Sequence, residues 1–227
     1  MALKVVMGQR LLKANEQVAA ENRTRFAGAG TLVVNLISSP GAGKTTLLER
    51  TLPWLRDKFR IAVIEGDMYS VRDAQRIAGY EVEVVQINTA GVCHLDAPMV
   101  ARALEELSEA RYDLLFIENV GNLVCPAEFD LGEDLKVALL SVTEGADKPA
   151  KYPLVFQSAR AVVINKSDLL PYTDFELETV VTELKALNPE LEVFLLSAKT
   201  GEGIKEWCTW LEKLTGRKQA ASRSGTG

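Results

Sequence analysis

Residues 31–46 join a strand-forming run to a turn of the kind that binds phosphate. The apolar run TLVVNLI (31–37) leads into SSPGAGKTT (38–46), and a helical pattern follows. A glycine-rich turn between a strand and a helix is typical of a P-loop, whose backbone N–H groups surround phosphate oxygens. In such a loop Lys44 reaches the β- and γ-phosphates of a nucleotide, and the hydroxyl of Thr45 ligates Mg²⁺. The residues predicted to bind phosphate are Gly41, Ala42, Gly43, Lys44, Thr45 and Thr46.

One position of this turn departs from the P-loop pattern. Ser38 stands where G-x-x-x-x-G-K-[ST] has its first glycine. Gly41 and Gly43 still flank the turn that holds Lys44. We therefore expect the loop to keep its phosphate-binding shape.

Two later segments predict which base is bound. The run AVVIN (161–165) leads into NKSD, which has the NKxD arrangement of GTPases. An aspartate at its end accepts both the N1 and the N2 hydrogens of guanine, which adenine does not offer, and the lysine stem lies along the ring. The run EVFLLS (192–197) ends in Ser-Ala-Lys, which resembles a second guanine loop. The predicted guanine-binding residues are Asn165, Lys166, Asp168, Ser197, Ala198 and Lys199.

Acidic residues at strand ends are the candidates for magnesium binding and hydrolysis. Glu118 begins ENVG at the Walker B position, and Asp67 ends the second strand run. Because parallel strands open at one edge of a sheet, both carboxylates are expected to face the P-loop. Asp73 either joins them or caps a helix. The predicted catalytic residues are Lys44, Asp67, Asp73 and Glu118, and the predicted magnesium ligands are Thr45, Asp67 and Glu118.

The sequence shows no motif for activation of the attacking water. No glutamine follows ENVG at the position that Ras-like GTPases use to orient the attacking water. We therefore expect slow intrinsic turnover of GTP to GDP and phosphate.

Three further side chains have the types that bind transition metals. Cys93 and His94 are adjacent, and Cys125 follows the fourth strand run in ENVGNLVCP. Both segments leave one edge of the sheet, from strands that could be neighbours, and thiolate and imidazole are ligands for zinc or nickel. A buried thiol beside a surface histidine explains the same residues more simply, so both interpretations stay open here. A two-fold dimer would raise the number of candidate ligands to as many as six.

The elements that position these residues are predicted from apolar patterning. Nearly continuous β-branched runs indicate strands covered on both faces, and the helical patterns between several of them indicate βαβ units. The strand runs are 31–37, 60–66, 83–88, 113–119, 136–142, 161–165 and 192–197, and the helical patterns are 45–56, 99–107, 174–187 and 203–214. They predict an α/β fold, a three-layer P-loop G domain with a mostly parallel sheet of about seven strands.

Domain boundaries follow from the two ends of this pattern. Residues 1–28 are predicted as an N-terminal helical extension, with Leu11, Leu12, Val18 and Ala19 on one face. Residues 29–214 form the G domain. Residues 215–227 are predicted as a disordered tail, because their sequence, TGRKQAASRSGTG, shows no apolar periodicity.

Composition and charge further limit the class of protein that this chain can be. The net charge of −5 over 227 residues argues against a nucleic-acid surface, and no apolar run is long enough to span a bilayer. The first residues do not read as a signal peptide, and three cysteines, an odd number, are typical of reduced thiols in a cytoplasmic protein. Cys208 lies in an amphipathic pattern and is expected in the core.

Several segments resemble the HypB family of hydrogenase maturation GTPases. They are TAGVCHLDAPMV, LLFIENVGNLVCPAEFDLG, SVTEGADKPAKYPLVF and AVVINKSDLLPY, together with VIEGD and DAQRI. The resemblance covers about residues 10 to 213. It implies a SIMIBI-class G domain that dimerises with GTP and carries a metal site at the dimer interface. By the same resemblance, Cys93, His94 and Cys125 would form that site, holding Ni²⁺ or Zn²⁺.

The resemblance also implies a role and partners. The role is that of a metallochaperone that delivers nickel during maturation of [NiFe]-hydrogenase. The partners are a second copy of the chain, a small zinc-containing nickel chaperone and a hydrogenase large-subunit precursor. Some members of the family carry an N-terminal cysteine cluster or histidine-rich tract, but residues 1–30 contain neither residue type. Metal is therefore expected at the G-domain site alone.

Three other functions stay open on the sequence. A urease accessory GTPase has a Cys-Pro-His motif, whereas here Cys93 and His94 are adjacent and Pro98 comes four residues later. A GTP-controlled scaffold would use the same cysteines for a purely structural zinc ion. A regulatory GTPase that binds no metal is disfavoured by the Cys-His and Cys segments.

Overall fold

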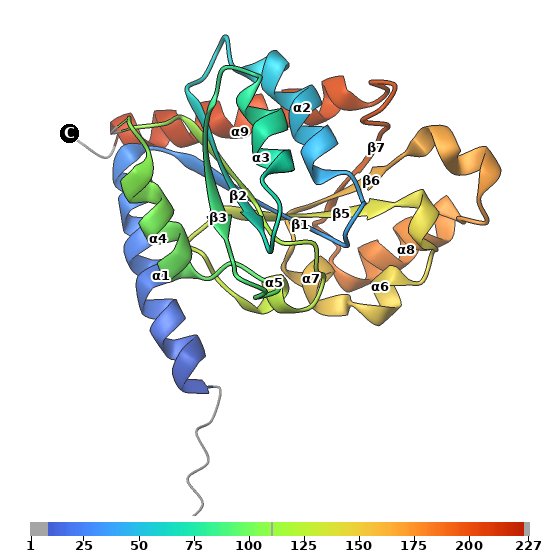
Figure 1. Cartoon of the computed structure of the whole chain (residues 1–227). Helices are drawn as coiled ribbons and strands as arrows, with labels where there is room; N and C mark the ends of the chain where they lie inside the picture. The colour runs from blue at the N-terminus through green and yellow to red at the C-terminus, as the bar shows by residue number, and fades with distance from the viewer. Residues whose placement is uncertain (1–8, 110, 225–227) are drawn as a thin grey trace, which may run out of the picture.

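The computed structural model describes residues 9–109 and 111–224, which form a central sheet between two layers of helices (Figure 1). The strands are paired in parallel in the order β3-β2-β4-β1-β5-β6-β7. They are β1 (Leu32–Ser38), β2 (Ile61–Asp67), β3 (Glu83–Asn88), β4 (Leu114–Glu118), β5 (Leu135–Ser141), β6 (Ala161–Asn165) and β7 (Glu192–Leu195). The predicted α/β fold with a mostly parallel sheet of about seven strands is confirmed.

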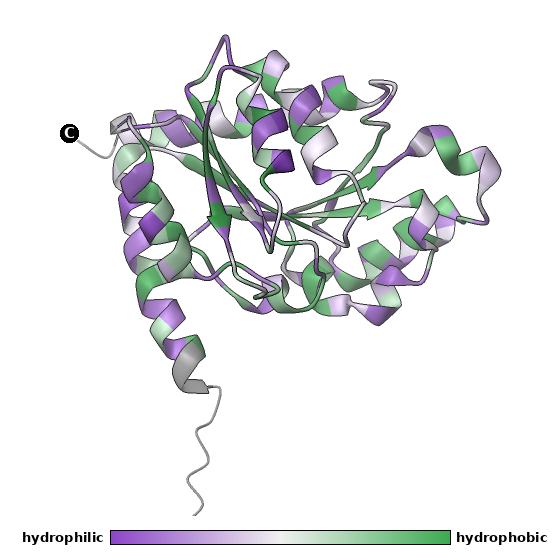
Figure 2. Cartoon of the chain, in the orientation of Figure 1, coloured by the Kyte–Doolittle hydropathy of each residue, from purple (hydrophilic) through white to green (hydrophobic). Residues whose placement is uncertain are grey.

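Helices cover both faces of this sheet, which is why the inner strands are apolar on both sides. One face carries α2 (Lys44–Leu55), α3 (Arg72–Ala78) and α9 (Ile204–Ser224) (Figure 1). On the other side lie α1 (Gln9–Ala29), α4 (Ala97–Glu106), α5 (Cys125–Glu128), α6 (Lys148–Lys151), α7 (Pro153–Ser158) and α8 (Leu177–Leu187). Figure 2 shows hydrophobic strands at the centre and hydrophilic residues mainly on the outer helices. Two short 3₁₀ turns, η1 (Val142–Glu144) and η2 (Ser167–Tyr172), follow β5 and β6.

The N-terminal helix α1 is held largely by buried asparagines. On the face that the sequence predicts, Ala19 is buried and Leu12 and Val18 are partly buried, while the side chain of Leu11 lies outside the described residues. Asn15, Ala19, Asn22 and Phe26 are its buried residues among those described. The side-chain amide of Asn22 donates to the backbone oxygens of Ala97 and Leu131, both at 3.0 Å. A buried amide with satisfied hydrogen bonds fixes orientation as well as contact, so α1 packs in one register against α4.

The prediction of a disordered tail from residue 215 is wrong for residues 215–224, because α9 continues to Ser224. Thr215 is fully buried, and its hydroxyl donates to the backbone oxygen of Leu211 at 2.9 Å. Lys218 pairs with Asp134, and Gln219 donates to a carboxylate oxygen of Asp113 at 2.7 Å. Polar side chains therefore anchor this part of the helix, which apolar periodicity does not detect. Residues 225–227 lie outside the described residues.

The carboxyl ends of the strands share one edge, where ligands bind in sheets of this kind. β1, which leads into the P-loop, lies between β4 and β5, at the point where the strand order reverses. The expectation that β3 and β4 could be neighbours is wrong, because β2 lies between them. No helix in the described part of the chain is both long and apolar enough to cross a membrane.

Candidate functional site

The P-loop between β1 and α2 requires glycine at its last turn. Gly43 caps α2 with φ of 102°, a left-handed conformation that favours glycine. A Cβ atom added there would lie 2.4 Å from the side-chain nitrogen of Asn165. The sharp turn thus brings the start of α2 against the segment expected to bind guanine.

Lys44 is pointed into the phosphate cavity by its neighbours in the loop. Its side chain is buried, and its Nζ donates to Oγ of Ser38 at 3.0 Å. Burial lowers the pKa of Lys44, and nearby carboxylates, foremost Glu118, oppose that shift. Ser38, which departs from the P-loop pattern, therefore supplies an oxygen that orients the lysine.

A cavity of about 340 Å³ opens beside this lysine, toward the ends of β2 and β4. The four residues predicted to be catalytic all line it: Lys44, Asp67, Asp73 and Glu118. Asp67 accepts hydrogen bonds from the backbone N–H groups of Tyr69 and Ser70, at 2.7 and 2.6 Å. Its carboxylate is thereby held at the cavity edge, where the chain turns toward α3.

The carboxylates of this cavity fit a divalent cation. The hydroxyl of Thr45 donates to one oxygen of Glu118 at 2.8 Å, and the other oxygen of Glu118 is buried without a hydrogen-bond partner. Glu65 lies beside Glu118 on the adjacent strand and also has a buried oxygen without a partner. Burial raises the pKa of Glu118, and burial followed by repulsion from Glu118 raises the pKa of Glu65 to about 8. Two buried acids with unpaired oxygens beside a threonine hydroxyl are the donor set that Mg²⁺ prefers.

A second cavity of about 270 Å³ shares Gly43 and Thr46 with the first. It is lined largely by the residues predicted to bind guanine, including Asn165, Lys166, Asp168, Ala198 and Lys199. The two cavities therefore adjoin at the start of α2, and we call the pair the nucleotide cleft.

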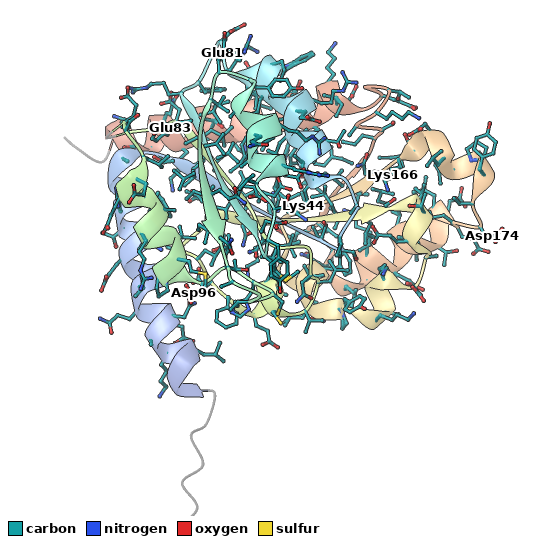
Figure 3. All side chains as sticks on the ribbon, in the orientation of Figure 1. Lys44, Glu81, Glu83, Asp96, Lys166 and Asp174 are labelled. Carbon is teal, nitrogen blue, oxygen red and sulfur yellow. The ribbon has the colours of Figure 1, made fainter. Side chains whose placement is uncertain are left out.

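Hydrogen bonds fix the polar groups of the base cavity. Asn165 donates to the backbone oxygen of Ala42 at 2.9 Å and accepts from the backbone N–H of Ala198 at 3.0 Å. The hydroxyl of Ser197 donates to a carboxylate oxygen of Asp168 at 2.5 Å. Lys166, labelled in Figure 3 near the P-loop lysine, donates to the backbone oxygen of Gly41 at 2.8 Å. The side chains of Asn165, Lys166 and Asp168 thus each have a hydrogen-bond partner that fixes their orientation.

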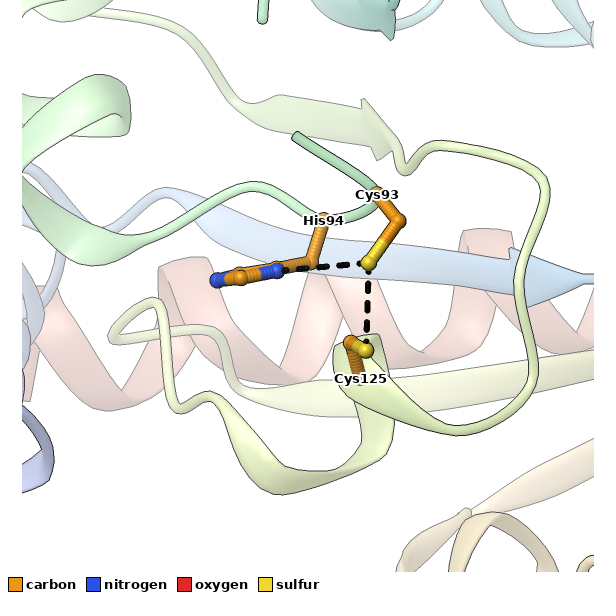
Figure 4. A group of neighbouring side chains, drawn as sticks. All are labelled: Cys93, His94 and Cys125. Atoms are coloured by element: carbon orange, nitrogen blue, oxygen red, sulfur yellow. Dashed lines mark hydrogen bonds between the residues drawn. The ribbon is translucent and has the colours of Figure 1, made fainter. Parts of the chain in front are cut away.

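The three metal-ligand candidates come together where the segments after β3 and β4 meet (Figure 4). The sulfur atoms of Cys93 and Cys125 are 3.2 Å apart, and the Cys93 sulfur lies 3.9 Å from Nδ1 of His94. One ligand atom from each residue lies within 4.8 Å of the others. All three side chains are partly exposed, so a metal ion can reach them. Their spacing and their exposure are those that a metal-binding cluster needs.

The surroundings of this cluster support ligand chemistry. The His94 ring stacks on Phe129 with 3.9 Å between ring centroids. Burial lowers the pKa of His94, which favours the neutral imidazole that binds metal. Hydrogen bonding to Cys93 raises the pKa of the Cys125 thiol, so the two sulfur atoms are already paired with each other. Cys208, by contrast, is fully buried in the core as expected.

Sequence reasoning missed several residues of these sites. Glu65 and Arg76 line the phosphate cavity, although the sequence analysis assigned neither of them a role. Arg50 donates to the backbone oxygens of Ala198 and Lys199, both at 2.9 Å, and so holds the second guanine loop. Asn122 donates to the backbone oxygen of Cys93 at 3.3 Å. These roles depend on tertiary proximity, although the ENVGN stretch did mark the segment that contains Asn122.

The fold and the cleft together define a P-loop nucleotide-binding protein with the residue set of GTPases. The family model for the CobW/HypB/UreG nucleotide-binding domain matches residues 32–195. The hydrogenase maturation factor HypB of Azotobacter vinelandii is 52% identical over 213 residues, which are 94% of this chain and 70% of that protein. The chain belongs to the CobW/HypB/UreG family, among the HypB hydrogenase maturation factors.

Solved structures agree with this placement. The crystal structure of HypB from Helicobacter pylori in complex with nickel has a TM-score of 0.85 and 38% identity, over 91% of this chain and 97% of that chain. The crystal structure of HypB from Archaeoglobus fulgidus has a TM-score of 0.84 and 37% identity, over 90% of this chain and all of that one, 100%. The similarity to both structures therefore extends over at least 90% of this chain.

Proposed function

We propose that this protein is a GTP-hydrolysing metallochaperone that delivers nickel during maturation of [NiFe]-hydrogenase. One observation carries the proposal. A Cys-Cys-His cluster and a nucleotide cleft are joined by a single short segment, which begins at Glu118 in the cleft and ends at Cys125 in the cluster. A change in that segment when nucleotide is hydrolysed would therefore move a metal ligand.

Binding of GTP would use the residues that already face the cleft. Asp168, oriented by Ser197, would accept the N1 and N2 hydrogens of guanine, and the stem of Lys166 would cover the ring. Lys44 would exchange its bond to Ser38 for oxygens of the β- and γ-phosphates. The backbone N–H groups at the start of α2 would surround the same phosphates.

Hydrolysis would take place among the four carboxylates of the phosphate cavity. Thr45, Asp67 and Glu118 would hold Mg²⁺, directly or through water, and the ion would supply positive charge to the phosphates. Asp67 or Asp73 would orient the attacking water, since both line the cavity beside the segment that follows β2. With carboxylates in that role and no glutamine, we expect slow turnover.

Nickel would be the cargo, bound by Cys93, His94 and Cys125. Three ligands from one chain leave coordination positions open, which suits an ion that must be passed on. Val92 and Val124, directly before the two cysteines, are 39% and 50% exposed. A second copy of the chain would cover these valines and add its own ligands, so GTP-favoured dimerisation would place the metal at the interface.

The other partners follow from the family. A small zinc-containing nickel chaperone would act as donor or acceptor, and a hydrogenase large-subunit precursor would receive the metal. This role places the protein in the cytoplasm, where the cysteines stay reduced.

The test is nickel binding by the purified protein with GDP and with a non-hydrolysable GTP analogue, while the oligomeric state is measured in the same samples. Cys93→Ala and Cys125→Ala should abolish binding, and Cys208→Ala, which removes a thiol from the core, should retain it. We expect about one nickel per dimer and an affinity that differs between the two nucleotides. Equal binding by wild type and the two ligand variants would refute the proposal.

The main alternative is a GTP-controlled scaffold with a structural zinc ion. The partly exposed ligands argue against it, because structural zinc sites are closed and four-coordinate. Zinc that resists exchange with a chelator in both nucleotide states would favour the scaffold. Nickel and zinc share these ligands, so exchange rate and not affinity separates the two functions.

A further inference from the structure

The phosphate cavity contains a second cation besides the P-loop lysine. Among the described residues that line it, the acids are Glu65, Asp67, Asp73 and Glu118, and the bases are Lys44 and Arg76. A nucleoside triphosphate adds several negative charges to this acidic cavity. Phosphoryl transfer is accelerated almost entirely by positioning and by positive charge, so the position of Arg76 bears directly on the rate.

Arg76 approaches the cavity from α3. Its Nε and Nη2 donate to both carboxylate oxygens of Glu49 on α2, at 3.0 and 2.6 Å. Its Nη1 donates to Asp73 at 2.9 Å, and its Nη2 also lies 3.2 Å from the hydroxyl of Thr46. A two-pronged bond to a carboxylate fixes the plane of a guanidinium group. The group is therefore oriented at the first turn of α2, where backbone N–H groups face bound phosphate.

The guanidinium group of Arg76 is oriented by its hydrogen bonds but remains accessible to solvent and to a ligand. Its side chain is 43% exposed, and that of Asp73 is 40% exposed. The bond to Asp73 can be exchanged for a phosphate oxygen while the two bonds to Glu49 remain. Such an exchange would also release the carboxylate of Asp73 toward the attacking water.

We infer that Arg76 contacts the phosphate chain of GTP and stabilises the charge that develops in the transition state. The inference rests on the proposed GTP hydrolysis and identifies a catalytic residue of that reaction. Glu49 is then a positioning residue, which holds the guanidinium plane. The competing interpretation is that the ion pair only fastens α3 to α2, in which case Arg76 and Glu49 are equivalent ends of one contact.

Steady-state GTP hydrolysis by wild type, Arg76→Gln, Arg76→Lys and Glu49→Gln separates these interpretations. Arg72→Gln is the matched control, since Arg72 lies on the same helix and does not line the cavity. We expect Arg76→Gln to lower kcat by about 10²-fold or more with little change in GDP affinity. Arg76→Lys should restore only part of the rate because it lacks the fork, and Glu49→Gln should lose no more than about tenfold.

Binding of GDP with aluminium fluoride, a planar mimic of the transferred phosphoryl group, gives a second readout. The wild type and Glu49→Gln should form this complex and Arg76→Gln should not, whereas a purely structural ion pair would affect both variants alike. Equal kcat losses in Arg76→Gln and Glu49→Gln, or an unchanged kcat in Arg76→Gln, would overturn the inference while the proposed function stands. A wild type that does not hydrolyse GTP would overturn both.

Discussion

The side-chain oxygen of Asn119 accepts a hydrogen bond from the backbone N–H of Leu95 at 3.1 Å. Asn119 follows Glu118 and lines the phosphate cavity, and Leu95 follows His94 in the metal-ligand segment. The amide of Asn119 also donates to Asn35 on β1 at 3.2 Å, so its orientation is fixed from the sheet. One buried side chain thus joins the nucleotide cleft to the segment that carries two metal ligands, and any coupling through it is reciprocal.

Replacing Asn119 by Ala should uncouple the two sites. In the wild type we expect the nickel affinity to differ at least about fivefold between GDP and a GTP analogue. In Asn119→Ala that difference should fall below about twofold, because the Leu95 segment is no longer hydrogen-bonded to a residue of the cleft. About one nickel per dimer should still be bound. Isothermal titration with each nucleotide measures both quantities.

The control variant must lose a similar free energy of unfolding while the hydrogen bond between Asn119 and Leu95 stays intact. Asn188→Ala removes a side chain that donates to the backbone oxygen of Ala159 at 2.9 Å and that neither lines a cavity of the cleft nor belongs to the metal-ligand cluster. Each variant should lose about 1–3 kcal/mol of unfolding free energy. Equal coupling in Asn119→Ala and the wild type would contradict the assignment of Asn119.

The selectivity for guanine should depend on Ser197 as well as on Asp168. Removing the hydroxyl of Ser197 frees the carboxylate of Asp168 to rotate, and GDP affinity should fall about tenfold. Asp168→Ala removes both bonds to the base, and the loss should be about 10²-fold or more. Competition against a fluorescent guanine nucleotide measures both effects.

Thr200→Ala is the matched hydroxyl control for this series. The backbone N–H of Thr200, which survives the substitution, donates to Oγ of Ser197 at 3.1 Å. GDP affinity should therefore stay close to that of the wild type. A loss as large as that of Ser197→Ala would mean that the loop as a whole, and not the Asp168 carboxylate, had been disturbed.

The strands and the cleft could be predicted because their causes are local. A strand buried on both faces needs a nearly continuous apolar run, and Leu32–Ser38 shows one that is buried at every position. The P-loop and NKSD follow such strands directly, so their common edge follows from the parallel pairing alone. The grouping of Cys93, His94 and Cys125 follows from the shared edge of the sheet, although the strands they follow are not neighbours.

What could not be predicted depends on contacts between distant segments. The insertion of β2 between β3 and β4 is a matter of strand order, which no run of residues encodes on its own. The end of α9 is held by Lys218 and Gln219 through acids near β4 and β5, so its polar sequence resembled a tail. Arg76 lies in the DAQRI segment, but its place in the cavity comes from packing of α3 on α2, which no run of residues encodes.

Thiol reactivity should separate the cysteines into two classes. Burial raises the pKa of Cys208 to about 12, whereas Cys93 and Cys125 are partly exposed. In the native protein at pH 8 an alkylating reagent should modify two thiols per chain, and the third should react at least about 10³-fold more slowly. Nickel should protect the two fast thiols, and mass spectrometry after quenching counts them. Three thiols of similar rate, or fast thiols that nickel leaves unprotected, would contradict the assignment of Cys93 and Cys125 as ligands.

The stability of the protein without Mg²⁺ and nucleotide should fall as the pH rises, because of Glu65. Its pKa is raised from 4.5 to about 8, so between these values the folded chain binds a proton that the unfolded chain has lost. Unfolding then releases a proton, and the free energy of unfolding decreases with pH until it levels off above about 8.

Glu65→Gln keeps the shape of the neutral acid and removes this titration. Relative to the wild type, its free energy of unfolding should rise by at least about 1 kcal/mol between pH 5 and 8, as measured by urea denaturation at a series of pH values. Glu105→Gln, at an exposed position of α4, should show no such trend. Parallel pH profiles for the wild type and Glu65→Gln would contradict this prediction. They would mean that Glu65 is already ionised in the folded protein without Mg²⁺, and that another group stabilises its buried carboxylate oxygen.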